Sequence, residues 1–446
     1  MLRKTFEKLL NKPNFLAYIY KRYSKEIEAC LDVLDNYRVV TETTRKFTYG
    51  IGEDNPYGDS PYSYKRMRKF SEIAKELESD PRKYKTYHSE SYSSSIKGFT
   101  RILECHKLHQ VDDNWDIYIP NGYNRIEIEL EKLKTSRPDQ IIFGIPGCDE
   151  LVGKSCLWRA LEAEFGREKA ATILPETFIL AEEDQIKLFK DHYKEGETYI
   201  LKQKKQRKQG LLLTQDLNEI LSAKEKEYVI VQDYKKNVLL VNNRKLNLRI
   251  YLLLTIKNNI LEAHINKYGT CIYNNKDYDP TTNDFESNIT SYNLDLKIYD
   301  TNPLTFKQLK TYLSEHGYEN PNILFERIDE KMKMVCDAIK PKLGRLENLK
   351  DNMCVQIFGM DFIVDTDLNP YLLECNKGPD MSPKKDGTYA SLINKIEDFY
   401  SAEKLVEKCY PDGYKSGNGL KVQRDMFKYL DIIDLKSSNN GFYKIY

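Results

Sequence analysis

A strand–turn–strand pattern over residues 358–376 constrains the fold of this 446-residue chain more than any other feature. Two apolar runs flank a short polar stretch, which predicts a β-hairpin. Folding the hairpin symmetrically about its turn places Asp361 opposite Glu374, at a Cβ separation of about 4.5–5.5 Å. Asn376 follows Glu374 by two positions and therefore shares its face of the strand. Three oxygen-bearing side chains are thus expected to converge.

Carboxylates as close as Asp361 and Glu374 repel each other unless a cation neutralises them. Magnesium prefers oxygen ligands and commonly uses one or two carboxylates together with substrate phosphates. We therefore interpret Asp361, Glu374 and Asn376 as a candidate magnesium site. The alternative is an ordinary hairpin whose polar residues lie on a solvated face. A carboxylate inside so apolar a run favours the metal.

From about residue 99 onward, apolar strands are interspersed with amphipathic helices, which predicts an α/β or α+β architecture. Strands are expected at 116–120, 140–144, 177–180, 198–202, 228–232, 246–256, 354–364 and 371–375. Helices are expected at 124–133, 156–165, 184–193, 306–313 and 322–339. Residues 1–97 follow a different pattern, and the tail after about residue 400 is expected to be helical.

Two basic segments suit an anionic ligand. Lys202 ends an apolar strand and leads into the basic loop 203–210, where cations and free backbone N–H groups would suit phosphates. Alternation over 244–251 places Lys245, Asn247 and Arg249 on one face of a strand. The alternatives are a solvated loop and an edge strand with its cations in water.

Bulk properties exclude several classes of protein. The formal net charge of +1 and the lack of a motif argue against nucleic-acid binding. No apolar run approaches the roughly 20 residues that span a bilayer, and the N-terminus lacks a signal-peptide core. The 9 cysteines form no CxxC pair, which is typical of reduced thiols in a cytoplasmic protein, and the 6 histidines give no zinc pattern.

The order of the motifs resembles that of the tubulin tyrosine ligase and ligase-like family, an ATP-grasp family. The similar segments are 145–154 (IPGCDELVGK), 175–180 (PETFIL), 202–210, 232–234 (QDY), 245–251 (KLNLRIY), 288–292 (NITSY), 359–362 (GMDF) and 374–376 (ECN). Residues 115–120, Tyr123 and Glu127 are similar to the family's lead-in domain. The resemblance covers about residues 98–400.

This resemblance implies an α+β, ATP-grasp fold in which two α+β subdomains grip ATP. The implied domains are an N-terminal extension of unknown role at 1–97, a small α/β lead-in domain at 98–150, the ATP-grasp core at 151–400 and a helical tail at 401–446. The implied activity is ATP- and magnesium-dependent joining of a carboxylate to an amine through an acyl phosphate. A free amino acid would be added to a protein acceptor, tubulin or microtubules, in the cytoplasm or at the cytoskeleton.

The resemblance also implies residue roles. Nucleotide-binding roles fall on Lys154, Lys202, Gly210, Gln232, Asp233, Tyr234, Lys235, Lys245, Asn247, Thr290 and Ser291, with Gln232–Lys235 as the adenine hinge. Arg249, Lys202 and Glu374 would act in catalysis, Arg249 by contacting the amino acid or acceptor. Asp361, Glu374 and Asn376 would hold one or two magnesium ions.

The chain departs from the family pattern at the substrate side. Asn247 stands where the family has an aspartate, and 288–291 reads NITS instead of HLTN. The family arginine that clamps the incoming amino acid is replaced within 270–273 (TCIY), and Lys267 or Lys377 would be a poor substitute for a bidentate fork. Two alternatives remain open: a degenerate module that binds ATP or a protein tail, and a ligase for a non-tubulin substrate.

Overall fold

The computed structural model describes residues 83–89, 99–100, 103, 108–204, 210–290, 296–379, 422–423, 425–432 and 440–446. The contacts divide the chain into two units, 1–85 with 386–397 and 86–385 with 398–446. The fold below is that of the second unit. Most of the predicted N-terminal extension, the loop residues 205–209 and Ser291 lie outside the described residues.

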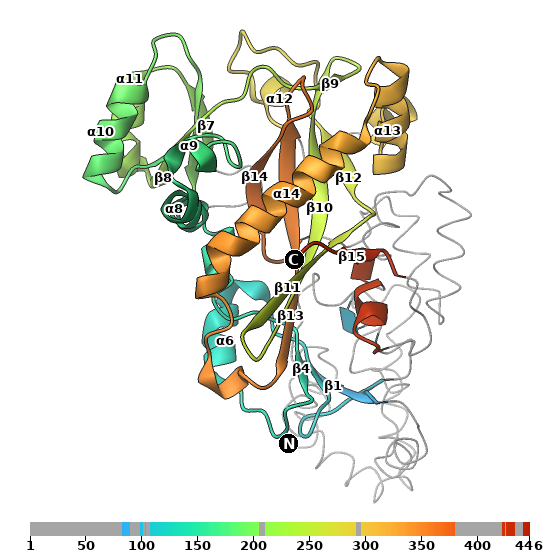
Figure 1. Cartoon of the computed structure of the whole chain (residues 1–446). Helices are drawn as coiled ribbons and strands as arrows, with labels where there is room; N and C mark the ends of the chain where they lie inside the picture. Colours follow the sequence, from blue (N-terminus) through green and yellow to red (C-terminus); the bar gives the residue numbers. More distant parts are fainter. Residues whose placement is uncertain are drawn as a thin grey trace, which may run out of the picture. The chain divides into compact units, whose positions relative to one another are not determined.

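A large mixed sheet forms the centre of this unit (Figure 1). Its strand order in the described residues is β15-β11-β10-β13-β4-β3-β1-β2, and β12 and β9 also pair with β10 while β14 pairs with β13. The long antiparallel strands are β10 (Arg244–Lys257), β11 (Ile260–Asn266), β12 (Thr270–Tyr273), β13 (Met353–Val364) and β14 (Pro370–Asn376), with the short β9 (Leu240–Val241) and β15 (Phe442–Lys444). The parallel strands are β1 (Thr86–His88), β2 (His109–Gln110), β3 (Ile117–Tyr118) and β4 (Ile141–Ile142).

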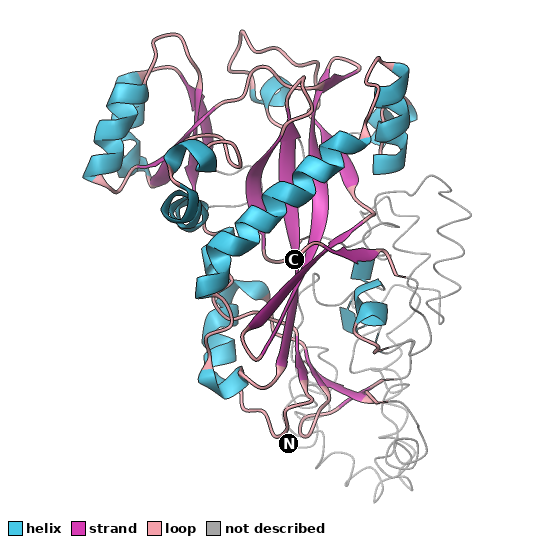
Figure 2. Ribbon diagram, viewed as in Figure 1, coloured by secondary structure: helices cyan, strands magenta, loops and turns pink. Residues whose placement is uncertain are grey.

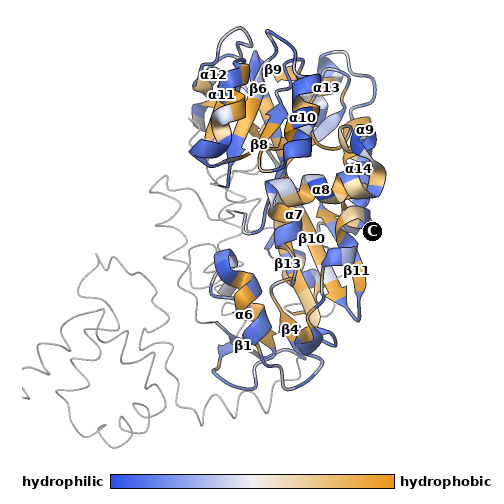
Figure 3. Ribbon diagram, turned by 90° about the vertical axis from the view of Figure 1, so that its left-hand side faces the viewer, coloured by the Kyte–Doolittle hydropathy of each residue, from blue (hydrophilic) through white to orange (hydrophobic). Residues whose placement is uncertain are grey.

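Strands β10 and β13 are buried on both faces along most of their length, and Figure 3 colours them as mostly hydrophobic. Two asparagine pairs close the hairpins at the two ends of β10. Asn242 and Asn243 have φ angles of 47° and 61°, and Asn258 and Asn259 have 51° and 61°. Positive φ at both central residues is the geometry of a type I′ turn, which matches the twist of the strands it connects.

A second, smaller sheet has the order β5-β8-β6-β7 and is antiparallel throughout. Its strands are β5 (Thr177–Ile179), β6 (Tyr199–Gln203), β7 (Leu211–Thr214) and β8 (Tyr228–Asp233). Helices α10 (Glu183–His192) and α11 (Leu217–Ser222) lie beside it (Figure 2). Its core contains Phe178, Phe189, Tyr199, Leu201 and Val231.

The remaining α-helices surround the large sheet and connect it to the small one. They are α6 (Ile126–Lys132), α7 (Asp149–Val152), α8 (Lys154–Phe165), α9 (Arg167–Ala170), α12 (Phe285–Asn288), α13 (Phe306–Glu315) and α14 (Asn322–Ile339). Helix α14 contacts both α8 and β14 and buries an apolar stripe toward them. No helix in the described part of the chain is long and apolar enough to cross a membrane.

The strands and helices predicted between residues 116 and 376 are all present, with ends shifted by a few residues. The mixed α+β class is therefore confirmed. Several elements were not predicted, among them β7, β11 and β12. In the tail, residues 425–429 are helical as expected, but β15 adds an unpredicted strand that pairs with β11.

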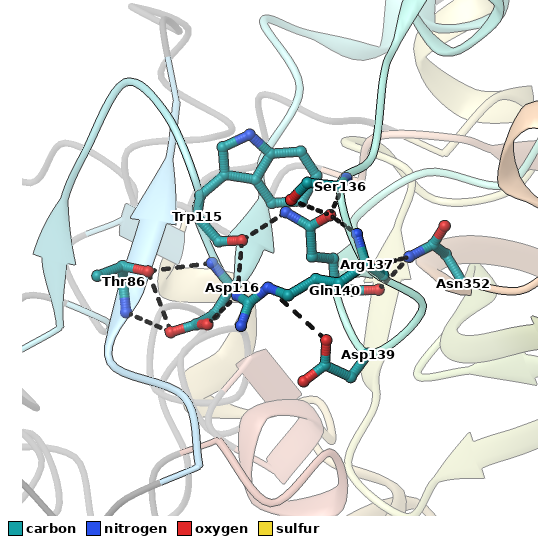
Figure 4. Close-up of polar contacts among 8 residues, drawn as sticks. All are labelled: Thr86, Trp115, Asp116, Ser136, Arg137, Asp139, Gln140 and Asn352. Atoms are coloured by element: carbon teal, nitrogen blue, oxygen red, sulfur yellow. Dashed lines mark hydrogen bonds and ion pairs between the residues drawn. The ribbon is translucent and has the colours of Figure 1, made fainter.

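A polar cluster joins the parallel strands at their N-terminal ends (Figure 4). The carboxylate of Asp116 accepts hydrogen bonds from the Thr86 amide (2.9 Å) and hydroxyl (3.0 Å) and forms an ion pair with Arg137. The side-chain amide of Asn352, next to β13, donates to the carbonyl oxygens of Arg137 (2.8 Å) and Gln140 (3.2 Å). The cluster thus links β1, β3, β4 and β13 without touching the hairpin carboxylates.

Asp116→Ala is expected to lower the free energy of unfolding by about 2–4 kcal/mol, because it leaves buried donors and the Arg137 guanidinium without their acceptor. Urea unfolding followed by circular dichroism measures this change. Asp139→Ala is the matched control, since its carboxylate is 54% exposed and lies 3.7 Å from Arg137 Nε. An effect of Asp116→Ala no larger than the control's, which should stay within about 0.5 kcal/mol, would contradict this interpretation of the cluster.

Candidate active site

The carboxylate hairpin has the register that the sequence predicted. Asp361 pairs with Glu374 across β13 and β14, and a β-bulge follows directly after this pair. The Asn376 side-chain amide lies 3.3 Å from Asp361 Oδ2 and 3.4 Å from Glu374 Oε1. The three side chains therefore converge on one face of the sheet.

Arg249 on β10 also belongs to this cluster. It lies opposite Asp361 in the β10–β13 register, and its Nε and Nη2 donate to Asp361 Oδ1 (2.5 Å) and Oδ2 (3.0 Å). Both side chains are largely buried, with 14% and 10% exposed. The sequence placed Arg249 on the correct face of its strand but did not predict this bidentate ion pair.

The electrostatics of this pair follow from burial and charge. Burial raises the pKa of Asp361, the Arg249 charge and hydrogen bonds oppose that shift, and Glu374 adds to it. Burial alone would lower the pKa of Arg249, but the charge and hydrogen bonds of Asp361 raise the pKa of the guanidinium overall. The guanidinium therefore neutralises one of the two hairpin carboxylates.

Lys202 connects the small sheet to the hairpin. It lies on β6, and its Nζ donates to the carbonyl oxygen of Leu373 on β14 at 3.3 Å. Burial lowers the pKa of Lys202 to about 8, Glu374 opposes the shift, and Lys154 at the start of α8 adds to it. A buried amine with a lowered pKa near a carboxylate pair is typical of a functional site.

Lys245 is a second buried amine on the same face of β10 as Arg249. Its Nζ donates to the Tyr234 hydroxyl (3.0 Å) and to the carbonyl oxygen of Asn288 (3.1 Å). Burial lowers the pKa of Lys245 to about 7, and the nearby Lys202 adds to this shift. Within the described residues, no carboxylate oxygen lies within 4.0 Å of either amine. An anionic ligand would supply the missing counter-charge.

Asn247 lies between Lys245 and Arg249 on β10. Its amide donates to Thr290 Oγ1 at 2.9 Å, while its buried Oδ1 accepts no hydrogen bond from any described residue. Ile272 on β12 stands opposite Asn247, at the place where the family clamp was expected. Of the suggested substitutes, Lys377 pairs with Asp149 (2.5 Å) and Lys267 lies over the Tyr268 ring.

The segment expected as the adenine hinge ends strand β8. The buried amide of Gln232 donates to Thr177 Oγ1 at 2.7 Å, so this side chain serves the small sheet. Asp233 Oδ1 lies 2.9 Å from His192 Nε2. Lys235 places its Nζ 4.4 Å from the centre of the Tyr371 ring on β14. Side chains of this segment therefore help to fix its position, and the backbone amides of Asp233 and Tyr234 donate to the carbonyl oxygens of Glu176 (2.9 Å) and Thr198 (3.3 Å).

A small pocket opens between this segment, α8 and the hairpin. Its lining includes Gly153, Lys154, Ile230, Gln232, Leu373 and Glu374. At the end of the basic loop, Gly210 has φ 71°, and a Cβ there would lie 2.6 Å from Gln203 Cβ. Only glycine suits this close approach, which lets the predicted phosphate loop return to the small sheet.

The donor set fits magnesium with nucleotide phosphates. Two carboxylates are hard ligands of the kind that magnesium prefers, and Asn376, whose NH2 group faces them in this structure, would offer its amide oxygen after rotation of the amide. The buried amines of Lys202 and Lys245 have no carboxylate within ion-pair distance in the part of the chain that the structure describes, and they suit phosphate oxygens. Asp361, Glu374 and Asn376 are therefore the residues that would hold the ion.

The mixed α+β architecture, with a buried lysine of a small sheet meeting a carboxylate hairpin of a large one, is consistent with an ATP-grasp-like fold. A family model described as the tubulin-tyrosine ligase family matches residues 132–399. The chain belongs to the tubulin-tyrosine ligase family.

Similar curated proteins are tubulin-modifying enzymes. Tubulin polyglutamylase TTLL7 of Xenopus tropicalis is 23% identical over 292 residues, covering 58% of this chain and 31% of the relative. Tubulin polyglutamylase TTLL6 of Mus musculus is 23% identical over 327 residues, covering 69% and 38%. Tubulin glycylase 3D of Tetrahymena thermophila is 28% identical over 205 residues, covering 43% and 19%. The chain thus spans well under half the length of these relatives.

Proposed function

We propose that this chain is an ATP- and magnesium-dependent ligase that adds an amino acid to a protein acceptor, with tubulin as the first acceptor to test. The observation that carries the proposal is the convergence of Asp361, Glu374 and Asn376, with Lys202 of the small sheet bonded to the same hairpin. Membership of the family supports it, since the similar proteins are named for tubulin glutamylation and glycylation. We further propose that the protein acts in the cytoplasm, at the cytoskeleton. We also propose that the lead-in domain covers residues 98–150 and the ATP-grasp core residues 151–400.

The proposed chemistry balances without a protein nucleophile. An oxygen of the acceptor carboxylate bonds to the γ-phosphorus of ATP, and ADP leaves. The amine nitrogen of the incoming amino acid then bonds to the carbonyl carbon, phosphate leaves, and the amine loses a proton. Magnesium, when bound, neutralises phosphate charge.

The chain's own residues would bind and orient the substrates and neutralise the phosphate charge. Lys154, Lys202 and Lys245 would hold phosphate oxygens, and their charges would offset the negative charge that develops during transfer. The backbone of 232–235 would hold the adenine, with Gly210 in the loop over the phosphates. Asn247 and Thr290 would orient the nucleotide or the incoming amino acid, through the unpaired Asn247 Oδ1 in particular. Ser291 would lie near the phosphates.

The test uses purified full-length protein with ATP, magnesium, tubulin and each labelled amino acid in turn, followed by mass spectrometry of tubulin. The expected result is an ATP-dependent mass increase that matches one amino acid. The names of the relatives make glutamate and glycine the first donors to test. If an amino acid is incorporated into another protein but not into tubulin, the proposed acceptor is wrong and the proposed reaction stands.

A second candidate is a degenerate module that binds ATP or a protein tail without catalysis. Asn247 in place of an aspartate, and Ile272 at the expected clamp, favour it. It predicts saturable ATP binding with no incorporation of any amino acid and no ATP hydrolysis.

Nucleotide affinity is expected to fall as the pH rises from 7.5 to 9. The pKa of Lys245 is about 7 and that of Lys202 about 8, so in the protein without nucleotide Lys245 is already mostly neutral at pH 7.5 and Lys202 loses its charge across this range. Bound phosphate would raise both pKa values, so binding takes up protons, and affinity falls by up to about tenfold per pH unit for each coupled group. Calorimetry in two buffers of different ionisation enthalpy measures the uptake.

The exposed Lys190 on α10 provides the matched control. Lys190→Met should retain the pH dependence, whereas Lys245→Met should reduce it together with the affinity. An affinity that stays constant from pH 7.5 to 9 in the unmodified protein would refute the assignment of the two lysines to phosphate.

A further inference from the structure

The guanidinium of Arg249 engages both oxygens of Asp361, the residue expected to bind the metal. The two side chains face each other across a paired β10–β13 position, and the two hydrogen bonds form a parallel fork. Such a fork is among the stronger and more directional polar contacts in proteins. A cation that binds Asp361 through the lone pairs that face Arg249 must therefore compete with the guanidinium.

The structure makes room for this fork at Gly359. This glycine lies two residues before Asp361 on the same face of β13. A Cβ at position 359 would lie 3.3 Å from Arg249 Cδ, 3.5 Å from Nε and 2.8 Å from Pro379 Cβ. The aliphatic stem of Arg249 thus passes over Gly359 to reach Asp361. The arrangement is packed in place and is not a chance contact of an exposed side chain.

The charges around the fork explain why a cation sits there. Asp361 and Glu374 are paired across the hairpin, and Asn376 donates to both. Without a counter-ion, the buried carboxylate of Asp361 and the half-buried carboxylate of Glu374 would repel each other. Arg249 supplies one positive charge, which leaves the pair short of full neutralisation. A divalent ion would supply two.

We propose that Arg249 takes the place of the metal ion when no ion is bound and holds Asp361 until a divalent cation replaces it. The released guanidinium then contacts an anionic group of the substrates. This inference rests on the proposed function. It makes metal and nucleotide binding interdependent, because the nucleotide phosphates both accompany the cation and offer Arg249 a new partner. Without nucleotide, competition from Arg249 keeps cation affinity low.

The experiment measures Mn²⁺ binding directly by electron paramagnetic resonance, with and without adenylyl imidodiphosphate. Arg249→Gln should bind Mn²⁺ at least about tenfold more tightly than the unmodified protein when no nucleotide is present, because one competing charge has been removed. The enhancement by nucleotide should be correspondingly smaller in this variant. Arg249→Lys, which keeps the charge but loses the fork, should fall in between. Arg244→Gln on the same strand is the control and should leave Mn²⁺ affinity unchanged.

Stability gives a second measurement, since Arg249→Gln leaves Asp361 buried without its partner and weakens the fold. In the absence of nucleotide, Mn²⁺ should raise the melting temperature of Arg249→Gln more than that of the unmodified protein. Should the variant fold only when Mn²⁺ is present, that rescue is itself the expected result.

Equal or weaker Mn²⁺ affinity of Arg249→Gln, or no stabilisation of it by Mn²⁺, would overturn the inference and leave the proposed function standing. Failure of the unmodified protein to bind Mn²⁺ even with the nucleotide analogue would instead remove the metal site of the proposed function, and this inference with it.

Discussion

Glu374→Gln is expected to reduce ATP-dependent amino-acid incorporation by at least about a hundredfold while the protein stays folded. The substitution keeps the size and the hydrogen-bonding capacity of the side chain but removes one of the two charges that would hold the cation. Glu374 is half-buried and accepts a long hydrogen bond of 3.4 Å from the Asn376 side chain, so we expect the fold to depend little on its charge. Incorporation of labelled amino acid at saturating ATP and several magnesium concentrations measures the effect.

Asp361→Ala should be at least as damaging to activity, but it is the less informative variant. It also leaves Arg249 buried without a partner, a change that typically costs about 3–5 kcal/mol of stability. Asp367→Asn in the exposed turn of the same hairpin is the matched control and should keep full activity. Full activity in both Asp361→Ala and Glu374→Gln would remove the metal assignment.

The hairpin could be predicted because its determinants are local. Two apolar runs and a polar turn lie within about twenty residues, so a symmetrical fold fixes which residues face each other. The structure adds a bulge after Asp361 and a Leu368 with φ 59°, yet the Asp361–Glu374 pair is unaffected. The long helix α14 was predicted for the same reason, from a local apolar period that does not depend on its neighbours.

The ion pair of Arg249 with Asp361 could not be predicted, because it depends on the register of two strands more than a hundred residues apart. Alternation along β10 fixes the face on which Arg249 lies but not its partner on β13. The same limit applies to Lys245, whose partners Tyr234 and Asn288 come from separate segments.

Some missed elements did carry a local signal. The pair Asn258–Asn259 between two apolar runs is compatible with the left-handed conformation of a type I′ turn, and it would have predicted β11 after β10. The need for glycine at position 359 can be understood only from the three-dimensional structure, because the stem of the Arg249 side chain packs against it. A motif glycine can therefore mark close packing against a distant side chain as well as a turn.

Lys202→Met is expected to make the protein more stable and inactive. Lys202 is 5% exposed, and its pKa is about 8 in the folded protein against 10.5 for a lysine side chain in water. Holding this amine charged at pH 7 therefore destabilises the fold by about 3 kcal/mol, at 1.36 kcal/mol per pKa unit. Methionine fills a similar volume without the charge, so the free energy of unfolding should rise by about 2–3 kcal/mol once the lost hydrogen bond to Leu373 is included.

The pH dependence identifies the cause of that gain. Because the folded-state pKa is the lower one, the unfolded chain binds more protons between about pH 8 and 10.5, and the stability conferred by this group rises across that window. The unmodified protein should show the rise in urea unfolding, and Lys202→Met should lack it. Incorporation should fall by at least about a hundredfold, since the variant cannot neutralise phosphate beside the hairpin. A buried charge that destabilises the fold and is needed for turnover serves the function of the protein. Normal activity of Lys202→Met would show that this lysine has no part in the reaction, and its contact with the hairpin would then be structural only.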